Sequence, residues 1–242
     1  VLSDSSAVYG DTSAGKPVTF AVKPGATLVV DRPDAMGSGT GLAAARIEDG
    51  GTLTFWTPAG VNGPVTVQAG GRFQASNSGG LTGSGEVSFE SGSVLEISTP
   101  LGFSGPQAAA IAAALPPGQL VRLNADYYGS AVDMLDSLLA TKSPIYEVFN
   151  GDRRHANPLV AGTTVMTLDR DAATGAGGML VNDYASRSYA SAANGILAIG
   201  PNGGTIAATS NTTLYVTQRM RLGANALTIG ATNVLDRVLL PK

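Results

Sequence analysis

The chain contains no cysteine, one histidine, one tryptophan and four lysines among its 242 residues. Without cysteine there are no disulfides, no thiolate zinc sites and no cysteine nucleophiles. A single imidazole excludes sites that need two or three histidines, such as the His-Glu-x-x-His metalloprotease motif. The net charge is −3, and no basic stripe is present to neutralise a row of phosphates. We therefore expect no nucleic-acid partner.

Long apolar runs and charged residues are also scarce. No apolar run reaches the roughly 18 residues that span a bilayer, so we expect no transmembrane segment in this sequence. Charged residues make up 14% of the chain, against about 25% in an average globular protein. The sequence begins at Val1, and no signal sequence precedes it. We expect it to be a piece of a longer secreted protein.

Glycine is abundant, with 32 residues, and it recurs in a pattern. A glycine is followed three residues later by a large apolar side chain, with spacings of 25, 20 and 22 residues in a first group and 20 in a later pair. The pairs are Gly25 and Leu28, Gly50 and Leu53, Gly70 and Phe73, Gly92 and Leu95, Gly203 and Ile206, and, more loosely, Gly223 and Leu227. A period near twenty indicates a repeat architecture, in which each unit buries its apolar face only by stacking.

Within each repeat, apolar residues alternate with polar ones, which is typical of half-buried strands. In "GEVSFESGSVLEIS" this alternation predicts an interior filled by Val87, Phe89, Leu95 and Ile97. The same alternation predicts that Glu86, Glu90 and Glu96 face water. The strands are only three to five residues long, which favours one coil of an all-β solenoid over a hairpin meander. A β-sandwich or barrel is the alternative.

Residues 104–144 interrupt the pattern. "SGPQAAAIAAALPPG" has Ala108, Ile111, Ala112 and Leu115 at helical spacing, with Pro106 suited to the first turn. "LVRLN" then predicts a strand, and "SAVDMLDSLLATKSP" predicts a second amphipathic helix with Ser130 as N-cap. We expect a helical insertion at about 104–144 in one solenoid domain over residues 1–242, and such insertions can map to functional faces.

The repeat "GPVTVQAGGRFQASNSGGLTGSGEVSFESGSVLEIS" resembles the passenger domains of bacterial autotransporters. "NGILAIGPNGGTIAATSNTTLYV" is similar to autotransporter-associated β-strand repeats of giant secreted surface proteins. The resemblance covers residues 18–100 and 194–232. It implies a right-handed parallel β-helix, export, and a stalk, adhesin or filament role, and it transfers no catalytic residue.

The densest charge cluster is "DRRH", in which Arg153, Arg154 and His155 follow Asp152. It can bind an acidic sugar or a carboxylate, although a solvated loop has the same composition. No G-x-S-x-G motif accompanies His155, so a Ser-His-Asp triad is not indicated. Tyr127 and Tyr128, like Trp56, can stack on sugars if exposed, and for Trp56 core or rim packing is the favoured role.

Other candidate residues are carboxylates. Asp169 and Asp171 stand beside a Gly-rich turn and are weak candidates for calcium, since the EF-hand pattern lacks its further acids. Some β-helix proteins cleave polysaccharides with paired carboxylates. If coils stack in register, Glu90 stands near Asp49, but the acids are otherwise scattered.

Taken with the resemblance, these patterns predict a non-catalytic structural or adhesive module of a large secreted or cell-surface bacterial protein, without a cofactor. We expect its partners to be other copies of itself, adjacent repeats of the same chain, or cell-surface glycans. We expect an extracellular or cell-surface location, reached through an export signal outside this sequence. Two alternatives are a carbohydrate-binding or polysaccharide-cleaving β-helix protein and a self-assembling surface or phage component.

Overall fold

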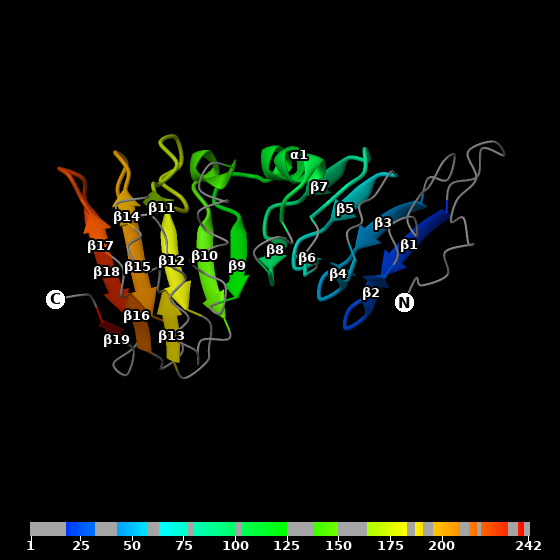
Figure 1. The fold of residues 1–242 in the computed structure, drawn as a ribbon, viewed down its shortest axis with the longest axis horizontal. Helices are drawn as coiled ribbons and strands as arrows, with labels where there is room; N and C mark the ends of the chain where they lie inside the picture. The colour runs from blue at the N-terminus through cyan, green and yellow to red at the C-terminus, as the bar shows by residue number, and fades with distance from the viewer. Residues whose placement is uncertain are drawn as a thin grey trace. The chain divides into compact units, whose positions relative to one another are not determined.

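The structure is a computed structural model of the chain. It describes residues 18–31, 43–57, 63–76, 80–99, 103–124, 138–149, 164–182, 187–190, 196–208, 213–216, 219–231 and 237–239. Contacts between Cα atoms divide the chain into two compact units, Val1–Pro116 (unit 1) and Pro117–Lys242 (unit 2). Figure 1 shows β1 to β8 and α1 of unit 1, and β9 to β19 of unit 2.

Unit 1 is built from two parallel sheets whose strands alternate along the chain. Sheet 1a has the order β1-β3-β5-β7, and sheet 1b has the order β2-β4-β6-β8. The strands are β1 (Val18–Val22), β2 (Thr27–Val30), β3 (Ala43–Ile47), β4 (Thr52–Phe55), β5 (Val65–Val67), β6 (Arg72–Ala75), β7 (Val87–Phe89) and β8 (Val94–Ile97). Each coil contributes one strand to each sheet, so the chain winds as a β-solenoid.

Glycine turns join the two sheets of unit 1, as the repeat predicts. Gly25, Gly50, Gly70 and Gly92 all have positive φ, between 71° and 87°. A side chain is strained in this conformation, whereas glycine adopts it freely. The N–H of Gly25 donates to the carbonyl oxygen of Gly50 (3.0 Å), that of Gly50 to Gly70 (3.1 Å), and that of Gly70 to Gly92 (2.9 Å). The turns therefore stack with the strands.

The core of unit 1 is a set of columns, each made of one residue per coil. Leu53, Phe73 and Leu95 are paired in register through β4, β6 and β8, and all three are fully buried. The Phe73 ring lies 5.4 Å from that of Phe55 and 6.1 Å from that of Phe89. These distances suit aromatic packing, and the columns bury the apolar face that a single coil leaves open.

Unit 2 has three parallel sheets. Sheet 2a has the order β11-β14-β17, sheet 2b β9-β10-β12-β15-β18, and sheet 2c β13-β16-β19. The strands are β9 (Leu120–Asn124), β10 (Ile145–Phe149), β11 (Thr164–Leu168), β12 (Met179–Asn182), β13 (Arg187–Ala190), β14 (Ile196–Ile199), β15 (Gly204–Ala208), β16 (Thr213–Val216), β17 (Arg219–Arg221), β18 (Leu227–Ala231) and β19 (Arg237–Leu239).

The core of unit 2 is likewise built from columns with one residue per coil. Val121, Tyr146, Leu180 and Ile206 form one inward column through β9, β10, β12 and β15, and each is fully buried. The predicted turns at Gly203 and Gly223 have φ of 84° and 59°. Gly118, with φ of 73°, is a further turn that the repeat search missed, and its N–H donates to the carbonyl oxygen of Lys142 (2.8 Å).

The predicted insertion contains one α-helix, α1 (Pro106–Ala114), with proline in its first turn. The residues placed on its buried face, Ala108, Ile111, Ala112 and Leu115, are at most 2% exposed. The strand predicted at "LVRLN" is β9. A short 3-10 helix, η2 (Ala140–Lys142), lies at the end of the second predicted helix, whose Ser130 cap falls outside the described residues.

The prediction of an all-β solenoid with a short α-helical insertion is thus confirmed, and the sandwich and barrel alternatives are wrong. Every strand pair among the described residues is parallel, because successive coils run in the same direction. A single domain over residues 1–242 stays a prediction. Within the described residues, no helix has the length and apolar character needed to cross a membrane.

Candidate functional site

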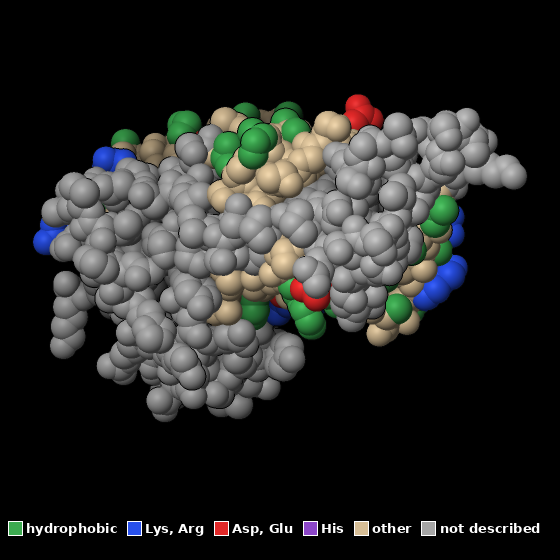
Figure 2. All heavy atoms as spheres, turned by 45° about the vertical axis from the view of Figure 1, so that its right-hand side comes forward, with side chains coloured by type: hydrophobic (Ala, Val, Ile, Leu, Met, Phe, Trp, Pro, Cys, Tyr) green, Lys and Arg blue, Asp and Glu red, His purple; other side chains and the backbone are tan. Residues whose placement is uncertain are grey.

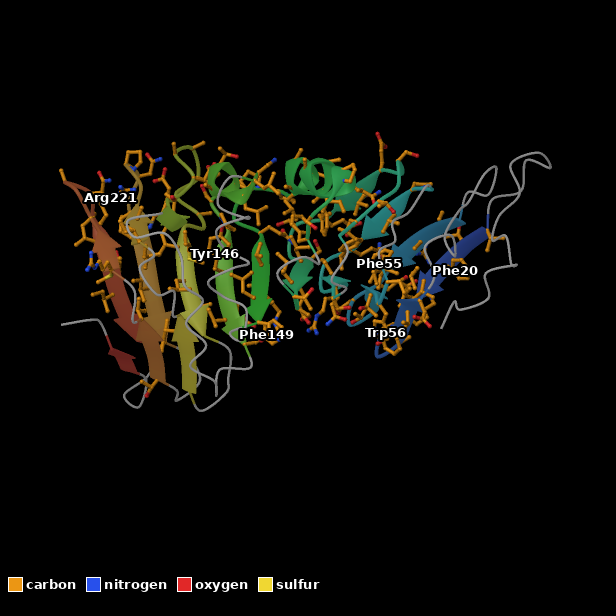
Figure 3. The ribbon with its side chains drawn as sticks, viewed as in Figure 1. Phe20, Phe55, Trp56, Tyr146, Phe149 and Arg221 are labelled. Atoms are coloured by element: carbon orange, nitrogen blue, oxygen red, sulfur yellow. The ribbon has the colours of Figure 1, made fainter. Side chains whose placement is uncertain are left out.

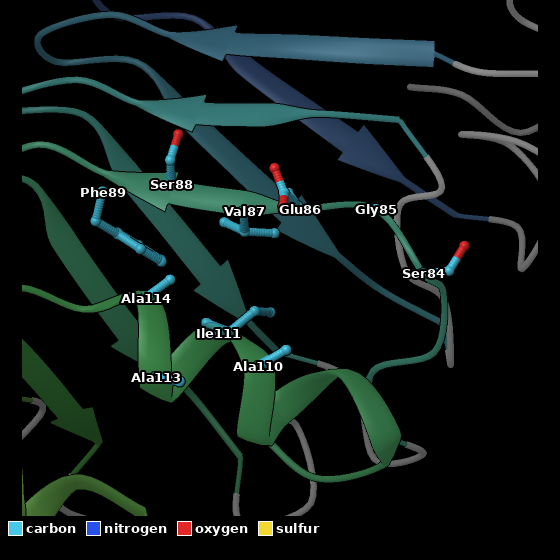
Figure 4. A pocket seen from close by; sticks show the side chains of 10 residues that line it. All are labelled: Ser84, Gly85, Glu86, Val87, Ser88, Phe89, Ala110, Ile111, Ala113 and Ala114. Carbon is cyan, nitrogen blue, oxygen red and sulfur yellow. The ribbon is translucent and has the colours of Figure 1, made fainter.

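A hollow of about 540 Å³ lies between β7 and α1 in the described part of unit 1 (Figure 4). Val87 and Phe89 line it from β7, and Ile111 lines it from α1 together with three alanines. The alanines are Ala110, Ala113 and Ala114. Such a volume is within the range of small-ligand pockets, which are mostly apolar.

The placement of α1 creates this hollow. The helix follows Gly105, whose φ is 83°, and the buried side chain of Gln107 donates to the carbonyl oxygen of Gly85 (3.0 Å), just before β7. The N–H of Leu81 also donates to the carbonyl oxygen of Ser104 (2.7 Å). These bonds hold α1 beside β7, where the alanines are too small to fill the space between helix and strand.

The outer edge of β7 faces this hollow. The carbonyl oxygen of Glu86 accepts from Val65 (2.8 Å), and the N–H of Glu90 donates to Val67 (2.9 Å). Along a parallel strand, backbone groups point alternately to the two sides. The N–H and C=O groups of Val87 and Phe89 therefore point toward α1. A helix laid along a strand in this way blocks the edge against pairing with another chain.

The hollow carries no catalytic constellation in its described lining. Figure 4 shows the side chains of Glu86 and Ser88 on the far side of β7, pointing away from α1. Apart from these two residues and from Ser84 and Gly85, the lining consists of apolar residues. The apolar side chains can hold an apolar group, but they supply no acid or base to a reacting bond.

Glu48 and Glu90 of unit 1 each interact with the preceding coil. Glu48 Oε1 pairs with Lys23 Nζ (2.7 Å) and with an Arg46 guanidinium nitrogen (2.9 Å). The hydrogen bond from Lys23, helped by Arg46, holds the pKa of Glu48 below its ordinary value. The Glu90 carboxylate, exposed as predicted, accepts from the backbone N–H of Ala69 (3.2 Å) in the previous coil.

The expectation that Glu96 faces water is wrong. Glu96 is 3% exposed, and its carboxylate accepts from Gln74 Nε2 (2.6 Å) and pairs with Arg72 (3.1 Å). The alternation does place Glu96 opposite the Leu95 column, on the outer face of sheet 1b. That face is itself covered, since Thr54 in the same outward row is 2% exposed. A paired, hydrogen-bonded carboxylate is the form in which such burial is tolerated.

The calcium candidates of unit 2, Asp169 and Asp171, accept hydrogen bonds from turn residues. Asp169 Oδ1 accepts from the N–H of Asn202 (2.8 Å), and its Oδ2 from the Asn202 amide (3.3 Å). Asp171 Oδ1 accepts from the hydroxyl and N–H of Thr174 (both 2.8 Å) and from the N–H of Ala173 (3.1 Å). The bonds from Thr174 hold the pKa of Asp171 below its ordinary value. Within the described ranges, no three metal-binding side chains gather.

Five of the remaining candidate residues lie outside the described part of the chain, namely Arg153, Arg154, His155, Tyr127 and Tyr128.

The prediction that Trp56 packs in the core is wrong. Its side chain is 58% exposed and projects from the end of β4, away from Phe55 (Figure 3). On the face in Figure 2, the acidic side chains that are drawn stand apart from one another.

One cluster in unit 2 escaped the sequence search. The guanidinium of Arg122 donates to Glu147 Oε1 (2.7 Å) and lies 4.6 Å from the ring centre of Phe149. The register of β9 against β10 creates this cluster, because it sets Arg122 opposite Glu147. In the sequence, this pairing is indicated by the 25-residue spacing between "LVRLN" and "IYEVF". The spacing can be seen as a repeat only if Gly118 is recognised as a turn.

The chain was also compared with protein-family models, with curated proteins and with solved structures, and none of the three comparisons finds a match.

Proposed function

We propose that the chain is a non-catalytic structural or adhesive module of a large secreted or cell-surface bacterial protein. The observation that supports this is where its charged and polar side chains make their contacts. Lys23 and Glu48, Gln74 and Glu96, and Arg122 and Glu147 each join one coil to the next, across 22 to 25 residues of sequence. They are placed to hold coils together.

An enzyme that cleaves polysaccharides needs the opposite arrangement. Its two carboxylates must face one bond, with one of them protonated near neutral pH. Here the pKa of Glu48 is lowered by Lys23, which favours the ionised form, and Glu96 is buried against Arg72. These described carboxylates are committed to cations of the scaffold, so a structural role fits them better than acid–base chemistry.

The proposed partners follow from this role. A solenoid module stacks on adjacent repeats of its own chain or on other copies, and an adhesive module binds glycans at the cell surface. We propose no nucleic-acid partner, because the whole chain carries 15 basic against 18 acidic residues. The proposed location is outside the bacterial cell.

Two measurements test the proposal. Antibodies raised against the purified chain are applied to intact and to lysed cells that produce the parent protein, and we expect labelling of intact cells. The chain is also incubated with a panel of acidic and neutral polysaccharides, and we expect no new reducing ends and no unsaturated uronates. Labelling only after lysis contradicts the surface role, and product release establishes the polysaccharide-cleaving alternative.

A further inference from the structure

Among the strands that end their sheets are β2 in sheet 1b and β18 in sheet 2b, and no described strand covers their outer edges. Ile229 in β18 continues the column of the fully buried Ile206, yet it is 50% exposed. Leu28 in β2 holds the matching position, three residues after its turn glycine, and is half-buried. It borders a hollow of about 200 Å³ together with Phe20 and Val22. The apolar columns thus reach solvent at both edges.

These two edges lack the protection that the edges of β7 and β17 have. Proteins usually block strand edges with charges or with a covering element. The edge of β7 is covered by α1, and β17, the last strand of sheet 2a, carries Arg219 and Arg221. By contrast, β2 ("TLVV") and β18 ("LTIGA") contain no charged residue. An unprotected edge beside an exposed apolar column is a pairing surface.

The backbone groups at the two edges are complementary. The carbonyl oxygen of Ala26 accepts from Thr52 (3.0 Å), so the alternation points the N–H groups of Thr27 and Val29 away from β4. The carbonyl oxygen of Ala226 accepts from Gly204 (3.0 Å), so those of Leu227 and Ile229 point away from β15. One edge therefore presents donors where the other presents acceptors.

The same pairing already occurs inside unit 1. The N–H of Arg72 in β6 donates to the carbonyl oxygen of Gly51 at the start of β4, and the N–H of Val94 in β8 donates to that of Gly71, both at 2.9 Å. Counted from the turn glycine, Thr27 occupies the position of Arg72 and Val94. In unit 2, Gly204 follows its turn glycine and pairs with Leu227, which makes Leu227 the equivalent of Gly51.

The side chains match in this register as well. Ile229 falls opposite Leu28 on the inward face, and Thr228 falls opposite Thr27 on the outward face. Threonine pairs already occur at this outward position, between Thr27 and Thr52 and between Thr205 and Thr228. Cross-strand threonine pairs and stacked aliphatic pairs both stabilise sheets.

We propose that β18 of one copy pairs in parallel with β2 of a second copy, head to tail. In this arrangement Thr27 N–H donates to Leu227 C=O, Val29 N–H donates to Ile229 C=O, and the Ile229 side chain packs over Leu28 into the hollow. The two surfaces are different, so the contact repeats and builds open filaments rather than closed dimers. This inference rests on the proposed structural role and identifies its partner as the chain itself.

Sedimentation velocity of the 242-residue chain over a wide range of protein concentrations tests this pairing. We expect the average mass to rise with concentration and filaments to be visible by electron microscopy at the upper end. Ile229→Lys places a charge in the interface, so we expect the same mass only at about tenfold higher concentration or above. Trp56→Lys changes an exposed apolar residue at the end of β4, in neither edge strand, so this variant is the matched control and should associate like the unmodified chain.

Val29→Pro tests the opposite edge. Proline removes the N–H that points away from β4, and it is tolerated on edge strands where that N–H is not used by the fold. We expect this variant to be folded by circular dichroism but to form no filaments. Thr27→Pro removes the neighbouring donor and serves if Val29→Pro does not fold.

Mixing the two single variants gives the sharpest result. Ile229→Lys keeps a functional β2 edge and Val29→Pro keeps a functional β18 edge, so we expect a mixture to form one-to-one dimers and nothing larger. A chain that stays monomeric throughout, a Trp56→Lys variant that dissociates equally, or a mixture that forms long filaments overturns the proposal. Polysaccharide cleavage with intact filaments refutes the proposed function alone.

Discussion

Replacing Phe73 by alanine should destabilise unit 1 strongly. Phe73 is fully buried in β6, paired in register with Leu53 and Leu95 of the adjacent strands. Its ring also contacts those of Phe55 and Phe89, at 5.4 and 6.1 Å between centroids. It is thus the point where an aliphatic column and an aromatic cluster meet, and coils on both sides depend on it.

The expected loss in the free energy of unfolding follows from that burial. Truncation of a buried phenylalanine to alanine costs about 3–5 kcal/mol, which includes the lost transfer free energy and the cavity left behind. Each of the two aromatic pairs contributes about 0.5–1.5 kcal/mol beyond its buried area. Because Phe73 loses both pairs and has rigid strands above and below, we expect a loss in the upper half of that range.

The assay is urea unfolding followed by fluorescence. Trp56, the single tryptophan of the chain, directly follows Phe55 in unit 1, so its emission reports on this unit. We expect the urea concentration at the unfolding midpoint to fall, with little change in the slope of free energy against urea. This combination marks a change in stability rather than in the area exposed on unfolding.

Glu86→Ala is the control, because Glu86 is exposed and a surface substitution changes stability by about 0.5 kcal/mol or less. A cost of less than about 1 kcal/mol for Phe73→Ala would mean that this column contributes little packing energy to unit 1.

Two further predictions concern polar side chains. Glu96→Ala removes a 3% exposed carboxylate from Arg72 and Gln74 and should cost about 2 kcal/mol in the same urea assay; a neutral result contradicts its burial. Because Thr174 lowers the pKa of Asp171 from an ordinary value of 3.8, this carboxylate stabilises its turn above that value, and the stabilisation is lost as pH falls through the lowered pKa. In an NMR titration, Thr174→Ala should raise the pKa of Asp171, and an unchanged pKa refutes the assignment.

Much of the fold could be predicted from local signals. The segments VSF and VLEI are β7 and β8, and the turn glycines of the repeat have positive φ. Such features follow from neighbours along the chain, because glycine is the residue that adopts the turn and alternation is set by the pleat.

The candidate site could not be predicted in this way. Its hollow depends on α1 lying beside β7 at a separation that its alanines do not fill, and helical spacing alone does not encode that distance. The pairing of Arg122 with Glu147 likewise depends on the register of two strands separated by 25 residues.

The sequence by itself determined that this chain coils, where its coils turn and which side chains, such as Leu95 and Ile97, fill the interior. The tertiary structure alone decided which outward positions are covered, so that Glu96 is buried and Trp56 is exposed although alternation places both outside the core. The physical reason is that alternation fixes only the face on which a side chain lies. The surroundings of that face depend on distant parts of the chain, whose positions no local pattern specifies.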